Sequence, residues 1–266
     1  IYIMSSRLEL KLSACMLYVY SNLTLGNAKA SERGLEIIRE CLRKEMEAPT
    51  SERNTAYCVF AGYMGTVLLH LSTEELPDMK KYMSSLPQGL RIFAANVISH
   101  DLYLKGEYSR ALGICDAALF SCKEIYPVGM IYLYCVTAMC EISLKNQAEA
   151  EKAILTAWKL AVKDELIEPF IELHGLLQGL LESCIRKENP EMYRKISDAV
   201  ITFSRGWMAV HNPASDRPVT DALTTMEFSI AMLACRDWSN REIAEHMGVS
   251  LNTVKHYLTD IFNKLH

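Results

Sequence analysis

The sequence lacks most of the features by which enzymes and disordered proteins are usually recognised. None of the patterns GxxxxGKS/T, GxGxxG, HExxH or GxSxG occurs, so no common catalytic motif supports an enzyme. Only 12 glycines and 8 prolines interrupt the 266 residues, and apolar residues make up 50% of them, a composition typical of a folded chain. We therefore expect a folded protein that is not an enzyme.

The nine cysteines form no CxxC pair and show no zinc-ligand spacing. Disulfide frameworks are typical of short secreted chains, so buried and reduced thiols are expected here. No signal peptide is visible, and the uncharged run Ile125–Cys140 falls short of the roughly 20 residues that span a bilayer. Pro127 and Gly129 also interrupt the start of that run. These features predict a cytoplasmic protein without a membrane segment.

An excess of positive charge is also absent, because 28 Lys and Arg stand against 32 Asp and Glu, a formal net charge of −4. Such a balance argues against a basic coat for nucleic acid, so any contact with DNA would have to be local. His174 lies between Glu172 and Glu182 and could belong to a metal or acid–base site, but a helix-surface histidine is the commoner case. The sequence predicts no metal or cofactor site.

Residues up to about 210 give almost no strand signal and favour an all-α fold of about ten helices. The helices are separated by short loops, in which prolines start or stop them: residues 49, 77, 87, 127, 169 and 190. The aromatic residues of these helices could line a ligand groove, but most such residues in helical repeats belong to the core. No ligand-binding residue is predicted from them.

Two segments, 102–119 and 142–161, are offset copies of one pattern. Ala111 and Ala150 hold equivalent positions 39 residues apart, and so do Ala118 and Ala157. Segment 21–41 is a looser copy. Small residues at fixed places let antiparallel helices approach closely, and this period is typical of helix-pair solenoids. The copies resemble degenerate tetratricopeptide (TPR-like) repeats.

Segment 160–184 resembles a late repeat of MalT-like transcription activators, which carry a Pro-Phe near the helix start and Leu-Leu pairs after it. Here the Pro-Phe is Pro169 and Phe170, and the leucine pairs follow at 176–177 and 180–181. The resemblance implies repeats that receive a small-molecule inducer or a protein partner. It also implies an ATP-binding domain upstream of Ile1, so the chain itself is expected to hold no cofactor. The opening reads as if entered within a helix, which suggests a fragment of a longer protein.

Residues 211–222, HNPASDRPVTD followed by Ala222, have two prolines and no apolar period, so we place a linker there. Three helix starts follow it. Thr224 with Glu227, and Ser239 with Glu242, have capping-box spacing. Gly248 suits the end of the second helix, and Ser250 can cap a third that runs to about Leu265.

The third helix is expected to be amphipathic. An apolar stripe runs through residues 254, 258, 261 and 265, and a polar face through residues 252, 255, 256, 259 and 263. The elements LTxxE, SNxEIA, SxxTVK and IxxKL, in one register over Leu223–Leu265, resemble the LuxR/NarL-type helix-turn-helix. The resemblance implies a recognition helix in the major groove. The fold would lack the family's last helix, which serves dimerisation.

Carried over by position, the resemblance assigns base contacts to Lys255, His256 and Thr259. It assigns phosphate contacts to Asn240 and Thr253, with Lys264 a weaker candidate. Departures from the family pattern occur at Met226, at Asp237 with Trp238, and at Tyr257. Residues 221–266 hold four Lys and Arg against six Asp and Glu, so one copy should bind DNA weakly and binding should depend on pairing two copies.

The sequence thus predicts three parts: a TPR-like repeat domain at 1–210, a linker at 211–222 and a truncated helix-turn-helix at 223–266. The function it favours is a bacterial transcription regulator that binds double-stranded promoter DNA as a homodimer or higher oligomer. The alternative is a TPR-like scaffold for a protein or peptide, whose terminal helices serve only association. An enzyme with an unrecognised site in the repeats carries little weight.

Overall fold

The computed structural model describes residues 5–25, 27–70, 76–211 and 223–265, and these residues form helices and turns without a β-strand. The longer helices are α1 (Leu8–Thr24), α2 (Ala28–Glu47), α3 (Glu52–Tyr63), α4 (Gln88–Leu104), α5 (Tyr108–Ser121), α6 (Pro127–Ser143), α7 (Gln147–Ala161) and α10 (Pro190–His211). Short elements join them: η2 (Met64–Leu68), η3 (Met79–Ser85), η4 (Val162–Asp164), α8 (Glu168–Glu172), η5 (Leu181–Ile185) and α9 (Arg186–Glu188). The predicted all-α class is confirmed.

The last three helices are α12 (Thr225–Ala234), α13 (Asn240–Met247) and α14 (Leu251–Leu265). Helix α10 extends to His211, one residue into the expected linker, because its helical pattern continues to that point. Residues 212–222, the rest of that linker, lie outside the described residues. Within the described ranges no helix is long and apolar enough to cross a membrane.

The two offset segments form two helical hairpins with the same internal geometry. Helices α4 and α6 begin 39 residues apart and end 39 residues apart, and the same offset separates the starts of α5 and α7. At the equivalent turn positions, Gly106 and Lys145 both take a left-handed conformation, with φ of 75° and 62°. Ala111 and Ala150 are both fully buried where the paired helices meet. The sequence period therefore corresponds to a structural repeat of α4–α5 in α6–α7.

The hairpin of α1 and α2 has a turn of the same length, since three residues separate its helices as in the other two hairpins. Gly34 lies so close to α1 that an added Cβ would meet Val19 Cγ2 at 2.6 Å. Ser31 is fully buried beside it, and its hydroxyl donates to the Val19 carbonyl oxygen at 3.3 Å. Small side chains on α2 thus allow the close approach that the repeat pattern predicted.

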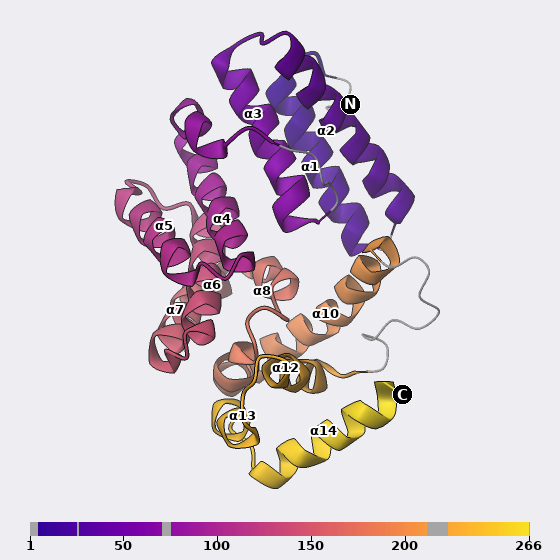
Figure 1. Ribbon diagram of the computed structural model, residues 1–266, viewed down its shortest axis with the longest axis vertical. Coiled ribbons are helices and arrows are strands. Elements are labelled where there is room, and N and C mark those ends of the chain that lie inside the picture. The colour runs from indigo at the N-terminus through magenta and orange to yellow at the C-terminus, as the bar shows by residue number, and fades with distance from the viewer. Residues whose placement is uncertain (1–4, 26, 71–75, 212–222, 266) are drawn as a thin grey trace.

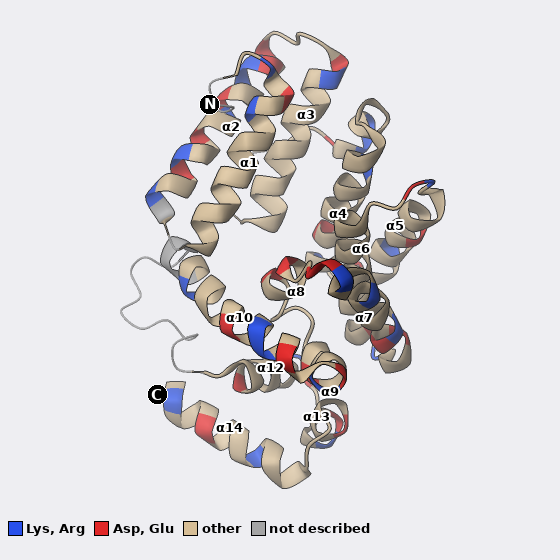
Figure 2. Ribbon diagram, turned by 180° about the vertical axis from the view of Figure 1, so that it is seen from behind, with Lys and Arg blue, Asp and Glu red and all other residues tan. Residues whose placement is uncertain are grey.

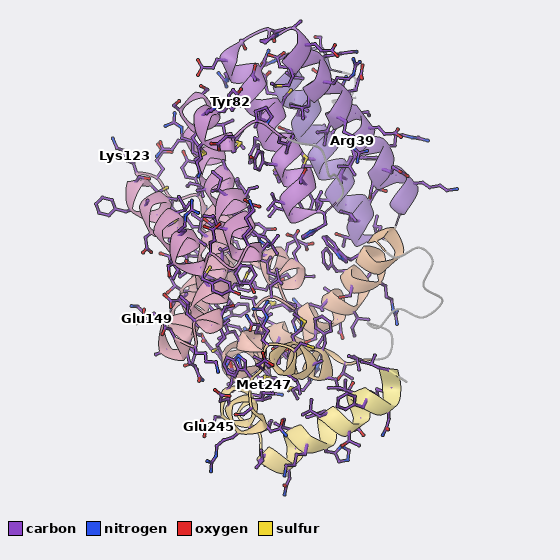
Figure 3. All side chains as sticks on the ribbon, viewed as in Figure 1. Arg39, Tyr82, Lys123, Glu149, Glu245 and Met247 are labelled. Atoms are coloured by element: carbon purple, nitrogen blue, oxygen red, sulfur yellow. The ribbon has the colours of Figure 1, made fainter. Side chains whose placement is uncertain are left out.

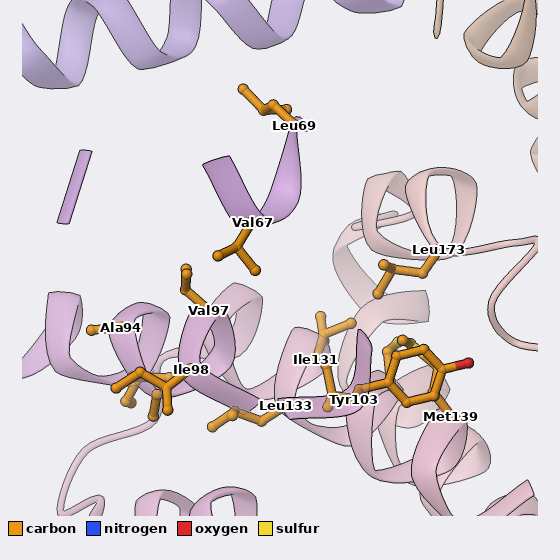
Figure 4. Close-up of a cluster of buried hydrophobic side chains, with 14 of the residues drawn as sticks. Val67, Leu69, Ala94, Val97, Ile98, Tyr103, Ile131, Leu133, Met139 and Leu173 are labelled. Atoms are coloured by element: carbon orange, nitrogen blue, oxygen red, sulfur yellow. The ribbon is translucent and has the colours of Figure 1, made fainter. Parts of the chain in front are cut away.

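One apolar core runs through residues 12–200. Figure 4 shows its central part, where Val97 and Ile98 of α4 and Ile131 of α6 lie among side chains from η2 and from the turn after α8. Figure 1 shows α1, α2 and α3 side by side at one end, the two hairpins α4–α5 and α6–α7 along one side, and α10 opposite them. Helix α10 packs on α1 and α8 and closes the arrangement next to α12.

Candidate nucleic-acid interface

Both predicted capping boxes at the start of the terminal domain are present. The Thr224 hydroxyl accepts from the Glu227 backbone N–H at 3.3 Å, and the Glu227 carboxylate accepts from the Thr224 N–H at 2.7 Å. Ser239 and Glu242 repeat this pair at the start of α13. Gly248 ends α13 with φ of 64°, a conformation that costs glycine little. These local interactions fix where α12 and α13 begin and how the turn into α14 is made.

Helix α14 packs against α12 and α13 over a small core of its own. Val254 is fully buried and Ile261 is 4% exposed, as the predicted apolar stripe requires. Leu265, the last member of that stripe, is instead 46% exposed, because the end of α14 extends past the described residues that could cover it. The apolar stripe therefore packs the first three turns of α14 against α12 and α13, and the last turn is not packed against them.

The three predicted base-contact residues lie on the solvent side of α14. Lys255, His256 and Thr259 are all exposed, and no hydrogen bond among the described residues ties them to the repeat region. His256 Nδ1 lies 2.9 Å from Asp260 Oδ2, one turn along the same helix. The Thr259 hydroxyl donates to the Lys255 carbonyl oxygen at 3.0 Å. The fold brings the three side chains together on one accessible face.

The three residues predicted to contact phosphate differ in their exposure and in their hydrogen-bond partners. Asn240 is the first residue of α13 and is half-buried, and the half-buried Thr253 shares a 2.7 Å hydrogen bond between its hydroxyl and that of Ser250. Lys264 Nζ donates to both carboxylate oxygens of the buried Glu227, at 2.7 and 2.8 Å. These hydrogen bonds lower the pKa of Glu227, although its burial acts in the opposite direction. At most one Lys264 N–H remains for a phosphate.

The few cations of this domain serve two different purposes. Arg236 and Lys264 are engaged with other protein groups, whereas Arg241 and Lys255 are exposed. Figure 2 shows acidic and basic residues interspersed along α14 rather than a continuous basic surface. The described part of the terminal domain therefore has few free cations, and its general attraction for phosphate should be weak.

The terminal domain docks on the repeat region through polar contacts centred on Arg236. Its guanidinium donates to the hydroxyls of Tyr103 and Ser143, at 2.7 and 2.9 Å, and lies 5.6 Å from the centre of the Tyr103 ring. Beside it, Lys145 Nζ lies 3.0 Å from Glu242 Oε1. The backbone and side chain of Ser239, followed by Lys145, lower the pKa of Glu242 to about 2. Ser143 is the last residue of α6, and Lys145 lies in the turn between α6 and α7.

A second part of the junction is buried. His246 of α13 is 1% exposed, and its Nε2 lies 2.7 Å from the Gln178 carbonyl oxygen, which accepts a hydrogen bond. Met247 packs against Gly179, where an added Cβ would meet the Met247 sulfur at 2.4 Å. Figure 3 shows Met247 on the side of α13 that faces the repeat region and Glu245 on the opposite side. Helix α13 is therefore held by the repeats through one face only.

His174 corrects the expectation of a surface histidine. It is 3% exposed, and its Nε2 lies 2.8 Å from Oε1 of Glu182, which is 1% exposed. The adjacent Phe228 ring of α12 lies 6.5 Å from the His174 ring. The reason for the burial is that α10 and α12 cover this turn, which no pattern within residues 160–184 reveals. No group of three or more metal-ligating side chains gathers in the described ranges.

Sequence reasoning missed the residues that join the two regions. In the sequence Arg236 and Lys145 look like ordinary surface cations. In the structure each of them contacts a residue about a hundred positions away in the chain. One sequence feature pointed to this turn, because Asp237 stands where the LuxR pattern usually has glycine. In the structure Asp237 takes a positive φ of 60° at the turn before α13. That turn directs Arg236 toward the repeats and Trp238 toward Lys145. The Lys145 ammonium lies 5.8 Å from the centre of the Trp238 ring.

Comparison with known families bears on the terminal domain. Residues 221–266 match the family described as bacterial regulatory proteins, luxR family. Neither a curated protein nor a solved structure matches the chain. The luxR family consists of DNA-binding regulators rather than enzymes. The capped helices, the exposed face of α14 and this match together support a LuxR-type regulator that binds DNA through residues 221–266.

Proposed function

We propose that the chain is the sensing and DNA-binding part of a bacterial, cytoplasmic transcription regulator. Residues 1–210 form a TPR-like, MalT-like repeat domain that receives an inducer or a protein partner, residues 211–222 are the linker, and residues 223–266 bind promoter DNA. The single observation that carries the proposal is the exposed set Lys255, His256 and Thr259 on α14, within a segment that matches the luxR family. Two copies would bind adjacent half-sites.

In the proposed complex the N-terminal half of α14 lies in the major groove. Lysine and histidine can donate to the N7 and O6 acceptors of guanine, and the Thr259 methyl can contact thymine. Asn240, Thr253 and the remaining N–H of Lys264 would position the helix on phosphates. The contacts of the terminal domain with the repeats leave the three base-contact side chains exposed, so docking by itself does not cover them.

The direct test is the double variant Lys255→Ala with His256→Ala. The wild-type chain first selects its preferred duplex from a random DNA library, and affinity for that duplex is then measured by fluorescence anisotropy. We expect the double variant to bind at least about 30-fold more weakly, since each of the two base contacts contributes about 1–3 kcal/mol. Its circular dichroism and melting temperature should match the wild type, because both side chains are exposed.

Lys123→Ala is the matched control, since Lys123 is an exposed cation on the far side of the molecule, in the loop after α5. It should bind the selected duplex as the wild type does. If the double variant keeps its affinity and its sequence preference, the regulator proposal is wrong. A TPR-like scaffold with an associating terminal domain would then be the better account.

The salt dependence of DNA binding should be shallow. Arg236 and Lys264 are engaged within the protein, so Arg241 and Lys255 are the main exposed cations of the domain. The logarithm of affinity falls with the logarithm of salt concentration by about 0.9 for each phosphate neutralised. We expect a slope of about −2 to −3 for each copy, measured by titrations from low to physiological salt. A slope steeper than about −6 would show that phosphate contacts lie elsewhere on the chain.

A further inference from the structure

A large cavity, open to solvent at its edge, lies in the repeat region, away from the face that we assign to DNA. It has a volume of about 890 Å³ and is formed by α1, α3, η2, α4, α6 and the segment that contains α8. A second cavity of about 580 Å³ adjoins it. Five residues line both cavities: Tyr20, Leu68, Asn96, Tyr132 and Glu172. The joint space is large enough for a small organic molecule, since ligand pockets commonly have such volumes.

The walls of the first cavity are mainly apolar and aromatic. Leucine, methionine, tyrosine and phenylalanine side chains come from α1, α3, η2, α4 and α6, among them Met16, Phe60 and Phe93. Met16, Phe60 and Phe93 belong to the core or pack against it, so this part of the walls is supported from behind. A ligand that fills such a space would gain from burying an apolar body.

The charged residues that line the first cavity have one sign. Its described lining includes Glu165, Glu168 and Glu172, and no lysine, arginine or histidine. Glu165 is exposed at the edge and has Lys195 at 3.3 Å. Glu172 lies deeper, half-buried, where it accepts a 2.7 Å hydrogen bond from the Tyr132 hydroxyl through Oε2. Its hydrogen-bond partner is thus a neutral group, and no described cation is paired with it.

The surroundings of Glu172 disfavour its charge. Burial, together with the neighbouring Glu168 carboxyl, raises the pKa of Glu172 to about 7, against the Tyr132 hydrogen bond, which lowers it. Burial also raises the pKa of Glu168. A buried carboxylate without a cation is costly, and a cation brought beside it would remove that cost.

Asn96 gives an independent indication of a ligand. It is 2% exposed and lines both cavities, yet its Oδ1 has no hydrogen-bond partner among the described residues. A buried amide oxygen without a donor typically costs about 1–3 kcal/mol. Asn96 on α4 and Glu172 on α8 both line the same space, and each carries an oxygen that can accept a hydrogen bond. A ligand with several N–H donors would satisfy them together.

We propose that this cavity binds an organic amine with an aromatic or branched apolar body, its ammonium group donating to Glu172 and Asn96. The negative charge of the lining repels anionic ligands. The apolar walls favour an amine with an apolar body over a small inorganic cation. The inference rests on the proposed function in one respect, which is that such an amine would be the inducer. The binding site itself does not depend on what the terminal domain does.

Titration calorimetry on the full chain at pH 7.5 tests the site with three matched pairs of probes. These are tryptamine and tryptophol, phenethylamine and 2-phenylethanol, and hexylamine and hexanol, with 3-phenylpropionate as the acid. At least one amine should bind at least tenfold more tightly than its alcohol, because only the amine offers a charge and several donors. The acid should show no binding. If no amine shows this preference, the proposal is wrong.

Two variants locate the site. Glu172→Gln keeps the shape and an acceptor for Tyr132 but removes the charge, so the preference for amine over alcohol should fall to about threefold or less. Asn96→Leu should weaken amine binding about three- to tenfold. Glu149→Gln, an exposed position on α7, is the matched control and should change nothing. A preference that survives in the Glu172→Gln variant would place the amine elsewhere and overturn the assignment.

Affinity for the selected DNA duplex, measured without any amine, separates this inference from the proposed function. Amine binding that fails while sequence-specific DNA binding is normal overturns the cavity assignment alone. Amine binding that succeeds while DNA binding fails leaves the cavity site standing and overturns the regulator.

Discussion

Replacing His174 by leucine should destabilise the protein by about 3–5 kcal/mol, the largest effect that we expect from one substitution in the repeat region. His174 and Glu182 are 3% and 1% exposed, and their side chains meet at 2.8 Å. Burial favours a neutral Glu182, but the charge of the His174 ring and its hydrogen bond lower the pKa of this carboxyl overall. Removal of the ring leaves a buried carboxylate with only the Tyr193 hydroxyl, at 3.3 Å, as a described partner on the same oxygen.

The effect should depend on pH in a defined direction. The folded pKa of Glu182 is lowered, so its contribution to stability is present above the unfolded value of about 4.3 and disappears as pH falls through the folded value. The difference between wild type and His174→Leu should therefore be largest near pH 6–7 and smaller near pH 3. Urea unfolding followed by circular dichroism at both pH values measures it.

The double variant His174→Leu with Glu182→Met is the control. Replacing both members of a buried pair by apolar side chains of similar size is often neutral or stabilising, whereas removing one member is not. The double variant should therefore recover to within about 1 kcal/mol of the wild type. If the single variant is as stable as the wild type, the pair is not ionised in the folded protein, and the assigned cause is wrong.

The elements that sequence predicted well are those fixed by neighbours in the chain. The capping boxes at Thr224 and Ser239 and the left-handed Gly248 depend on residues within four positions, so their spacing was sufficient. The 39-residue period predicted the equivalent bounds of α4–α5 and α6–α7, because a repeated pattern of small and apolar residues repeats the same packing. The exposed face of α14 likewise follows from its amphipathic pattern.

Features formed by segments far apart in the chain could not be predicted from local sequence patterns. His174 is buried by α10 and α12, and the acceptors Asn96 and Glu172 of the cavity come from helices more than seventy residues apart. Arg236 reaches Tyr103 across 133 residues of sequence. Tertiary contacts decide these sites, and one sequence carries no record of them.

Gly179→Ala should have the second large effect, on the docking of the terminal domain. Gly179 has a φ of 84°, a conformation that costs an alanine roughly 1–2 kcal/mol. Its new Cβ would also meet the Met247 sulfur at 2.4 Å and His246 Nε2 at 3.3 Å. The flexible Met247 side chain can turn its sulfur aside, but His246 Nε2 is held by the neighbouring Gln178 carbonyl, so we expect the rest of the clash to push α13 away from the repeats. We expect a total loss of about 2–4 kcal/mol.

Hydrogen exchange distinguishes loss of docking from general destabilisation. In Gly179→Ala the amides of α13 should exchange faster relative to those of α6, whereas Gly113→Ala should leave the ratio of the two exchange rates unchanged. Gly113 lies within α5 with nothing within 4 Å of an added Cβ, so that control should be stabilised by about 0.5–1 kcal/mol. Equal acceleration in α13 and α6 would contradict a local loss of docking.

The same variant separates docking from DNA recognition. Lys255, His256 and Thr259 are exposed while the terminal domain is docked, and their helix is held by α12 and α13 rather than by the repeats. Affinity of Gly179→Ala for a single half-site should therefore stay within about threefold of the wild type. A much larger gain would mean that docking restrains the DNA-binding face despite its exposure. A large loss would mean that the repeats hold α13 and α14 in the geometry that DNA requires.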